Sequence, residues 1–161
     1  MSELIKLSTR IGETLQRRGW TAATAESCTG GWIAKCMTDV AGSSAWFDRG
    51  FVTYSNGAKQ DMLGVDAAVL ESEGAVSEAT VAAMVRGALA HSRADIAVAV
   101  SGIAGPGGGR PGKPVGTVCF AWATRDGMQR LASCHFEGDR DTVRQQAVSH
   151  ALQGLLDAVN A

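Results

Sequence analysis

The sequence predicts an α/β fold, namely a three-layer α/β/α sandwich around a mixed central sheet. Three observations support this prediction. Helical patterns open and close the chain, from Leu4 to Leu15 and from Arg140 onward. The unbroken apolar run Ile96–Val100 is typical of a strand that is covered on both faces. Two β-rich segments joined by Asp126-Gly127 are typical of an antiparallel hairpin. These patterns do not predict the strand order.

The individual elements carry the usual start and stop signals. A basic pair followed by Gly19 ends the first helix, Gly64 closes a short one, and Ser77 caps the helix before the buried strand. The expected elements are, in order, a helix from Leu4 to Arg18, a strand at Thr21–Ala25, a helix containing Ile33, Cys36 and Met37, a strand at Phe51–Tyr54, a helix at Ala58–Leu63, a helix after Ser77, strands at Ile96–Val100, Val115–Thr124 and Met128–Phe136, and a final helix from Arg140. We expect one domain over residues 1–161, because the length suits a single compact unit and no linker or repeat divides it.

Composition excludes several function classes. The 161 residues have a net charge of −1 and no basic run, so nucleic acid is not an expected partner. No apolar stretch approaches the roughly 20 residues of a membrane span, and the N-terminus lacks the apolar core of a signal peptide, so we expect a cytoplasmic protein without membrane contact. The 4 cysteines form no C-x-x-C pair and are expected to be reduced, and the 3 histidines are scattered, so no metal site is expected.

A glycine-rich loop follows the buried strand. Seven of the 20 glycines and all 3 prolines fall between Gly102 and Gly116. Open α/β sheets bind ligands at such strand ends, and glycine lets backbone N–H groups approach an anion, so a phosphate is the expected guest. The alternative is a flexible surface connection. Gly107–Lys113 matches the spacing of a P-loop, but Pro114 replaces the required Ser or Thr and a strand follows, so this is not a nucleotide triphosphate site.

A candidate nucleophile lies at the end of the first strand. Ser27 precedes the turn Thr29-Gly30-Gly31, whose amides are expected to face a developing oxyanion at the start of a helix. The alternative is that Ser27 or Thr29 only caps that helix. Cys28 is the second candidate nucleophile, although neighbouring side chains in a strand point to opposite faces.

A serine nucleophile needs a base, and Lys59 is the candidate. It follows the turn Tyr54–Gly57, and a lysine serves as a base when desolvation keeps it neutral. The alternative is a solvated lysine on a helix surface. Arg140 and Arg144 are one helical turn apart, where they either clamp a phosphate or pair with Asp139 and the adjacent Asp141.

Several motifs together resemble the CinA C-terminal domain family, in order and over nearly the whole chain. The matching segments are Ala25–Gly31 (AESCTGG), Gly42–Ser44 (GSS), Arg49–Asn56 (RGFVTYSN), Ser101–Pro106 (SGIAGP), Lys113–Val118 (KPVGTV) and Gly138–Arg140 (GDR). Stand-alone members of that family are nicotinamide-nucleotide amidases, which hydrolyse nicotinamide mononucleotide to nicotinate mononucleotide and ammonia. The chain is expected to lack the larger N-terminal domain of the longer CinA proteins.

The resemblance implies a cofactor-free serine–lysine amidase that acts on a small mononucleotide in pyridine-nucleotide recycling. Carried over by motif, the serine is Ser27 and the lysine is Lys59, with Tyr54 beside them. The expected substrate-binding and oxyanion residues are Thr29, Gly30, Gly31 and Asn56, and the expected phosphate-binding residues are Ser101, Gly102, Ile103, Ala104, Gly105 and Arg140. If the chain self-associates, a dimer is favoured. The competing interpretation is a nucleotide-binding or regulatory module that does no hydrolysis.

Overall fold

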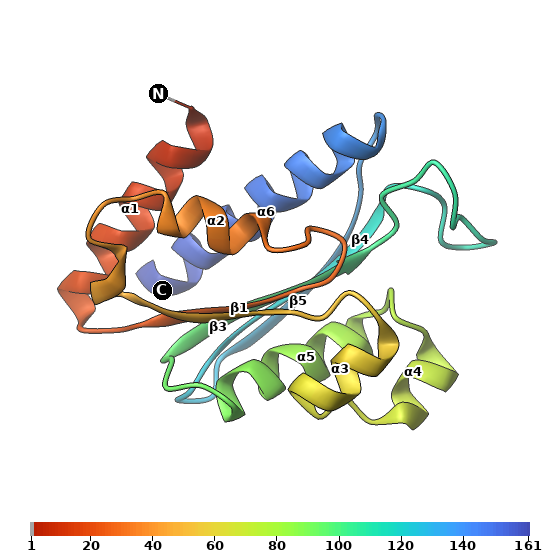
Figure 1. The fold of residues 1–161 in the computed structure, drawn as a ribbon, viewed down its shortest axis with the longest axis horizontal. Coiled ribbons are helices and arrows are strands. Elements are labelled where there is room, and N and C mark those ends of the chain that lie inside the picture. Colours follow the sequence, from red (N-terminus) through yellow and green to blue (C-terminus); the bar gives the residue numbers. More distant parts are fainter. Residues whose placement is uncertain (1) are drawn as a thin grey trace.

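The structure, a computed structural model, describes residues 2–161, in which a five-stranded sheet lies between two layers of helices (Figure 1). The helices are α1 (Glu3–Arg18), α2 (Trp32–Thr38), α3 (Asn56–Leu63), α4 (Ala67–Glu73), α5 (Glu78–Ala90) and α6 (Arg140–Asn160), and the strands are β1 (Ala22–Glu26), β2 (Phe47–Val52), β3 (Ile96–Gly102), β4 (Thr117–Thr124) and β5 (Gln129–His135). The strand order is β2-β1-β3-β4-β5. β1 is parallel to both of its neighbours and the remaining pairs are antiparallel. The predicted α/β sandwich with a mixed sheet is therefore confirmed.

The two faces of the sheet pack against different helices. In β3, Val98 and Val100 join the core cluster formed with α1, α2 and α6, whereas Ala97 and Ala99 join the cluster formed with α3, α4 and α5. This alternation follows from the two-residue period of a strand. Because β3 is covered on both sides, every residue from Ile96 to Val100 is 0% exposed, which explains its unbroken apolar sequence.

Several predicted boundaries are displaced, including the start of β4 at Thr117 rather than at residue 115, and two of these displacements have a clear cause. The second strand, β2, lies at Phe47–Val52 rather than at residues 51–54, because its limits are set by parallel pairing with β1, in which Phe47 faces Ala22 and Val52 faces Glu26. As an edge strand it is only partly buried and lacks a clear alternating pattern. The following helix, α3, begins at Asn56 rather than at residue 58, because Ser55 caps it by accepting the N–H of residue 58 at 3.0 Å.

Helix α4 was missing from the sequence-based expectation. It has seven residues, begins after the Asp66 cap and buries only Leu70, so it shows no amphipathic period. The other long elements match: α1 ends at Gly19 with a φ of 68°, and Ser77 caps α5 by accepting the Thr80 N–H at 3.1 Å. The hairpin between β4 and β5 also turns at the predicted Asp-Gly pair.

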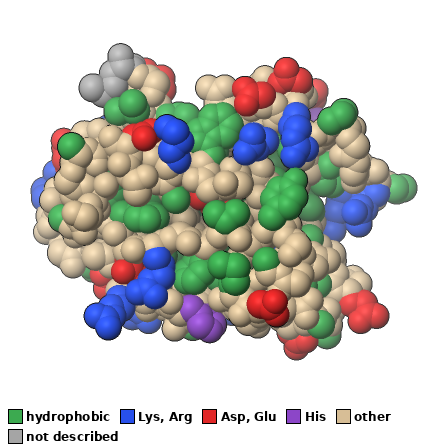
Figure 2. Space-filling view, viewed as in Figure 1, with side chains coloured by type: hydrophobic (Ala, Val, Ile, Leu, Met, Phe, Trp, Pro, Cys, Tyr) green, Lys and Arg blue, Asp and Glu red, His purple; other side chains and the backbone are tan. Residues whose placement is uncertain are grey.

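The surface carries both signs of charge. On the face drawn in Figure 2, basic and acidic side chains are intermixed, and hydrophobic side chains form a broken band across the middle. Among the described residues, the exposed large hydrophobic side chains are Val52 at the end of β2, Tyr54 in the loop that follows it, and Met62 on α3. None of the helices within residues 2–161 combines the length and apolar character that a membrane crossing requires.

Candidate active site

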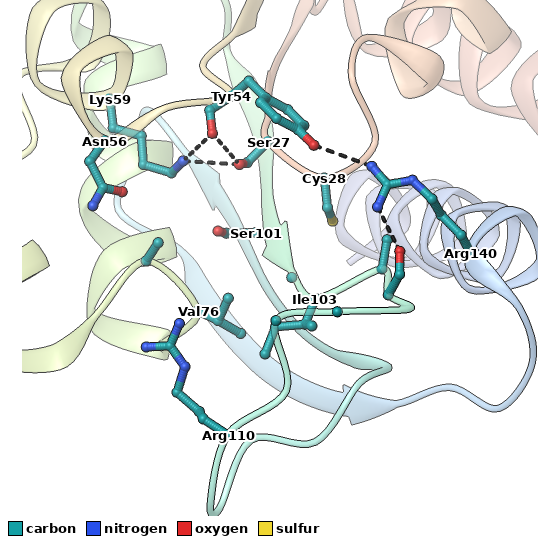
Figure 3. A pocket seen from close by; sticks show the side chains of 16 residues that line it. Ser27, Cys28, Tyr54, Asn56, Lys59, Val76, Ser101, Ile103, Arg110 and Arg140 are labelled. Atoms are coloured by element: carbon teal, nitrogen blue, oxygen red, sulfur yellow. Dashed lines mark hydrogen bonds between the residues drawn. The ribbon is translucent and has the colours of Figure 1, made fainter.

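The candidate site lies where the parallel strands β1, β2 and β3 end together. Open α/β sheets place their ligands at this carboxyl edge, because the loops that leave the strands diverge there. A cavity of about 300 Å³ opens between the turn after β1, the loop before α3, the glycine-rich loop after β3 and the start of α6 (Figure 3). Chain segments that lie far apart in the sequence therefore meet in one place.

Ser27 and Lys59 are in direct contact. Ser27 follows the last residue of β1 and its N–H donates to Val100 O at 3.0 Å, which fixes it to β3. Lys59 lies on α3 and its Nζ is 2.9 Å from Ser27 Oγ. The Lys59 side chain is 1% exposed and Ser27 is 7% exposed. The structure thus brings together the expected nucleophile and the expected base, from two elements 32 residues apart in the sequence.

The surroundings of Lys59 favour a neutral amine. Burial lowers the pKa of Lys59 below its ordinary value of 10.5. Within residues 2–161 no carboxylate lies within 4.0 Å of Nζ to oppose this effect. The remaining acceptors are the backbone oxygens of Thr53 at 2.9 Å and Tyr54 at 3.4 Å. A neutral amine has two N–H groups and one lone pair, so it can donate to these two carbonyls and still accept the proton of the Ser27 hydroxyl.

Cys28 is poorly suited to be the nucleophile. Its side chain is 6% exposed and belongs to the core cluster on the α6 side of the sheet, although it also lines the cavity. Burial raises the pKa of the Cys28 thiol to about 12. The thiolate is the reactive form of cysteine, so at neutral pH this thiol is protonated and weakly nucleophilic. The geometry therefore favours Ser27 over its neighbour.

Ser101 lies deeper in the site than expected for a phosphate ligand. β1 and β3 are in parallel register with Glu26 opposite Val100, so Ser27 and Ser101 are neighbours one residue further along. Ser101 is 2% exposed and lines the cavity, and among the described residues its hydroxyl has no hydrogen-bond partner (Figure 3). A hydroxyl that lines the cavity beside the nucleophile without a protein partner is a donor available to a bound substrate.

The glycine-rich loop and α6 form the opposite wall of the cavity. Gly102 to Gly105 line it, and Arg140 Nη1 donates to Gly105 O at 2.7 Å. Arg140 Nη2 donates to the Tyr54 hydroxyl at 3.2 Å, so this hydroxyl faces the guanidinium rather than Ser27. It is the Tyr54 backbone oxygen that contacts Ser27 Oγ, at 3.3 Å. A guanidinium has five N–H groups, so Arg140 keeps three for a ligand.

One part of the expected site lies elsewhere. Thr29, Gly30 and Gly31 do not line the cavity around Ser27 but a separate hollow, together with Trp32 and other residues of α2 and α6. The Gly30 N–H is already used by Ser27 O at 3.0 Å. The Gly30 N–H is therefore not available to an oxyanion, and the assignment of the oxyanion amides to this turn stays a prediction. Asn56 does line the cavity, from the first turn of α3.

The cavity also contains residues that the sequence analysis missed. Ala75 and Val76, which precede α5, form part of its wall, and Arg110 reaches it from the tip of the glycine-rich loop (Figure 3). Arg110 stands across the cavity from Arg140. Sequence analysis could have singled out Arg110, because it is a positively charged residue within a loop that was expected to bind an anion. Lys113, the lysine of the rejected P-loop match, donates to Glu73 O at 3.0 Å and does not line the cavity.

Comparison with known sequences gives consistent matches. Residues 4–159 match the CinA C-terminal domain. A nicotinamide-nucleotide amidohydrolase PncC of Escherichia coli strain K12 is 59% identical over 154 residues, covering 96% of this chain and 93% of that protein. The protein of the same name from Pseudomonas putida is 54% identical over 157 residues, covering 97% of both. A CinA-like protein of Akkermansia muciniphila is 57% identical over 144 residues, which are 89% of this chain but 35% of that protein.

Solved structures agree with the sequence matches. The crystal structure of the competence/damage inducible protein CihA from Agrobacterium tumefaciens matches with a TM-score of 0.97 and 47% identity, covering 100% of this chain and 98% of that one. A CinA superfamily protein from Klebsiella pneumoniae 700603 matches with a TM-score of 0.94 and 43% identity, covering 99% of both chains. The fold and its sequence motifs therefore occur together in these proteins.

Proposed function

Because the chain belongs to the CinA C-terminal domain family, we propose that it is an amidohydrolase that converts nicotinamide mononucleotide and water to nicotinate mononucleotide and ammonia. The observation that carries this proposal is the buried contact of 2.9 Å between Lys59 Nζ and Ser27 Oγ. A serine hydroxyl is a weak nucleophile until a neighbouring base accepts its proton. An amine whose pKa is lowered by burial is such a base.

In the first half of the proposed reaction, Ser27 becomes acylated. Lys59 Nζ accepts the hydroxyl proton while Ser27 Oγ forms a bond to the carboxamide carbon, and the C=O electron pair moves to the oxygen. When this tetrahedral intermediate collapses, the C–N bond breaks and Lys59 returns its proton to the leaving nitrogen, which departs as ammonia. An ester of Ser27 with the nicotinate carbonyl remains. Lys59 is neutral again and is ready for the second half.

In the second half, water replaces the serine. Lys59 accepts a proton from a water molecule whose oxygen attacks the ester carbon, and the bond to Ser27 Oγ then breaks. The proton returns to Ser27, and the carboxylic acid product ionises in solvent. Every proton movement uses the same amine, which the Thr53 and Tyr54 carbonyls hold in one orientation throughout. Water and these side chains suffice for this reaction.

The proposed oxyanion donor is the Ser101 hydroxyl rather than the Thr29–Gly31 turn. Ser101 is next to Ser27 in the strand register, and its hydroxyl lines the cavity and has no partner among residues 2–161. A donor that is desolvated and already oriented stabilises a developing negative charge more than water does. This assignment moves Ser101 from the expected phosphate-binding set to the reacting centre.

The proposed phosphate site is the wall formed by Gly102–Gly105 and Arg140. Arg140 is held by Gly105 O and the Tyr54 hydroxyl and still has N–H groups free, which suits a bidentate contact with phosphate oxygens. Asn56 lines the cavity near Lys59, at the opposite end from Arg140. In the proposed complex its amide contacts the carboxamide on the pyridine ring. Hydrolysis leaves the ribose phosphate attached to the pyridine ring. The proposed physiological role is therefore the recycling of pyridine nucleotides.

Ammonia release tests the proposal directly. The purified chain is incubated with nicotinamide mononucleotide, and ammonia and nicotinate mononucleotide are quantified together. Equal amounts of the two products are expected, with no release by the Ser27→Ala variant. The competing interpretation, a nucleotide-binding module without catalysis, predicts saturable binding of the mononucleotide and no ammonia. A positive release assay with a silent Ser27→Ala variant rejects that alternative.

A further inference from the structure

The turn that carries Ser27 leaves the sheet and depends on other contacts for its position. The last sheet bond is the Ser27 N–H to Val100 O, at 3.0 Å, and inside the turn the Gly30 N–H donates to Ser27 O at 3.0 Å. Gly30 and Gly31 both have positive φ angles, and glycine has the most conformational freedom of any residue. Ser27 itself is bonded to β3, and the contacts that hold the following turn from outside further restrict the orientation of its hydroxyl.

On its inner side the turn is held by Glu26. This carboxylate is 1% exposed, and its Oε1 accepts from Thr29 Oγ1 at 2.6 Å and from the Ile33 N–H at 2.9 Å. Its Oε2 accepts the Ala34 N–H at 3.0 Å. Glu26 thus joins the hydroxyl of the turn to the beginning of α2. These bonds do not involve the backbone carbonyls of the turn, of which Thr29 O accepts the Trp32 N–H at 3.0 Å.

On its outer side the turn is held by Arg144. Arg144 Nε donates to Cys28 O at 3.0 Å and its Nη2 donates to Thr29 O at 3.2 Å. The guanidinium also lies 5.4 Å from the centre of the Trp32 ring. Arg144 is part of α6, whose neighbouring residues Val143 and Ala147 are in the buried core, so its backbone has a fixed position. Charged donors make stronger hydrogen bonds to carbonyls than neutral ones.

We infer that Arg144 is a positioning residue that fixes the Cys28 and Thr29 carbonyls and thereby holds Ser27 Oγ at its contact with Lys59. The inference deepens the proposed function and rests on it for the meaning of that contact. Arg144 does not line the cavity around Ser27, so it acts without touching the substrate. It differs in this respect from Arg140, which lies one helical turn earlier and lines the cavity.

Arg144→Met tests the inference, because methionine keeps an unbranched stem beside Trp32 and removes both donors. We expect kcat to fall by about 10- to 100-fold, since a displacement of about 1 Å is enough to cost that much. The fold-decrease in kcat should be equal for nicotinamide mononucleotide and nicotinamide riboside, and the KM of each substrate should be unchanged. Arg144→Lys keeps a charge but not the planar fork, so it should recover part of kcat. Lys35→Met is the matched control, because Lys35 lines the same hollow but bonds to Asp39 instead of the turn.

A second measurement does not depend on the substrate. A small fluorophosphonate reacts with an activated serine, and mass spectrometry reports the rate at which Ser27 is labelled, alongside the thermal unfolding midpoint. Arg144→Met should label more slowly than wild type while remaining folded. Wild-type kcat and labelling rate in Arg144→Met, or a raised KM with unchanged kcat, would overturn the inference. If that variant does not fold, Arg144→Lys decides in the same way. A wild-type chain that labels but releases no ammonia rejects the proposed function, while the labelling series still tests Arg144.

Discussion

Replacement of Lys59 by methionine separates catalysis from folding in this protein. The change removes the amine that touches Ser27 Oγ at 2.9 Å and keeps a side chain of similar length in the buried site. A positioned general base typically contributes about 10²- to 10⁴-fold to a rate, so we expect kcat for nicotinamide mononucleotide to fall by that factor. Mononucleotide binding should persist, because Lys59 lies at the reacting end of the cavity and Arg140 at the other.

The same change should alter stability little, and in a pH-dependent way. Lys59→Met removes the N–H donor to the Thr53 and Tyr54 carbonyls, although Tyr54 O still accepts from the Ser27 hydroxyl, and each lost hydrogen bond costs roughly 1 kcal/mol. Against this loss, burial has lowered the pKa of Lys59 below 10.5, so the amine binds a proton more readily in the unfolded chain. That difference destabilises the folded wild type at pH values below 10.5, and wild-type stability rises as the pH increases toward 10.5. The variant lacks this rise.

Three measurements test this reasoning. Ammonia release over a pH series should show a wild-type rate that falls at acid pH as Lys59 becomes protonated. Urea unfolding at several pH values should show that the free energy of unfolding of Lys59→Met, relative to that of wild type, is highest at the lower pH values. Lys6→Met, at an exposed lysine of α1 paired with Glu3, is the control and should change neither quantity. A wild-type rate that is flat through the acid range, or a Lys59→Met variant with full activity, would refute the role of Lys59 as the base.

Other positions give equally specific expectations. Ser27→Ala should abolish turnover and retain mononucleotide binding, whereas Cys28→Ala should retain most activity because that thiol is protonated at neutral pH. Ammonia release measures the activity of both variants and titration calorimetry measures their binding. The reverse pattern would assign the nucleophile to the thiol. Arg140→Ala should weaken kcat/KM for nicotinamide mononucleotide by about 2 kcal/mol and leave nicotinamide riboside nearly unaffected, so equal losses for the two substrates would move the phosphate site elsewhere. Gly105→Ala should raise KM, because the φ of Gly105 is 86° and an added Cβ would stand 2.5 Å from a side-chain carbon of Val115. The resulting shift would displace the Gly105 carbonyl that holds Arg140. Gly107→Ala is the control and should leave KM unchanged, because an added Cβ there meets nothing within 4 Å.

The sequence alone determined the elements whose signals are local. The apolar period of α1 and α6, the Ser77 cap of α5 and the unbroken apolar run of β3 all appear in the structure where the pattern predicts them. Such signals depend on short-range backbone geometry and on whether one face of a helix or strand is buried. Both can be predicted from the types of residues that are close together in the sequence. Where the limits of an element are set by a partner strand, as in β2, the prediction was displaced by several residues.

Only the tertiary structure decided how the site is assembled. The family motifs pointed to Ser27 and Lys59, but their contact depends on the parallel pairing of β1 with β2 and β3, and on α3 packing against that face of the sheet. The register of β3 with β1 brings Ser101 next to Ser27, where it lines the same cavity. The Thr29–Gly31 turn lines a separate hollow, and Glu26 and Arg144 bind it through its hydroxyl and its carbonyls respectively. These outcomes are set by register and packing between segments up to 116 residues apart, which no pattern of neighbouring residues encodes.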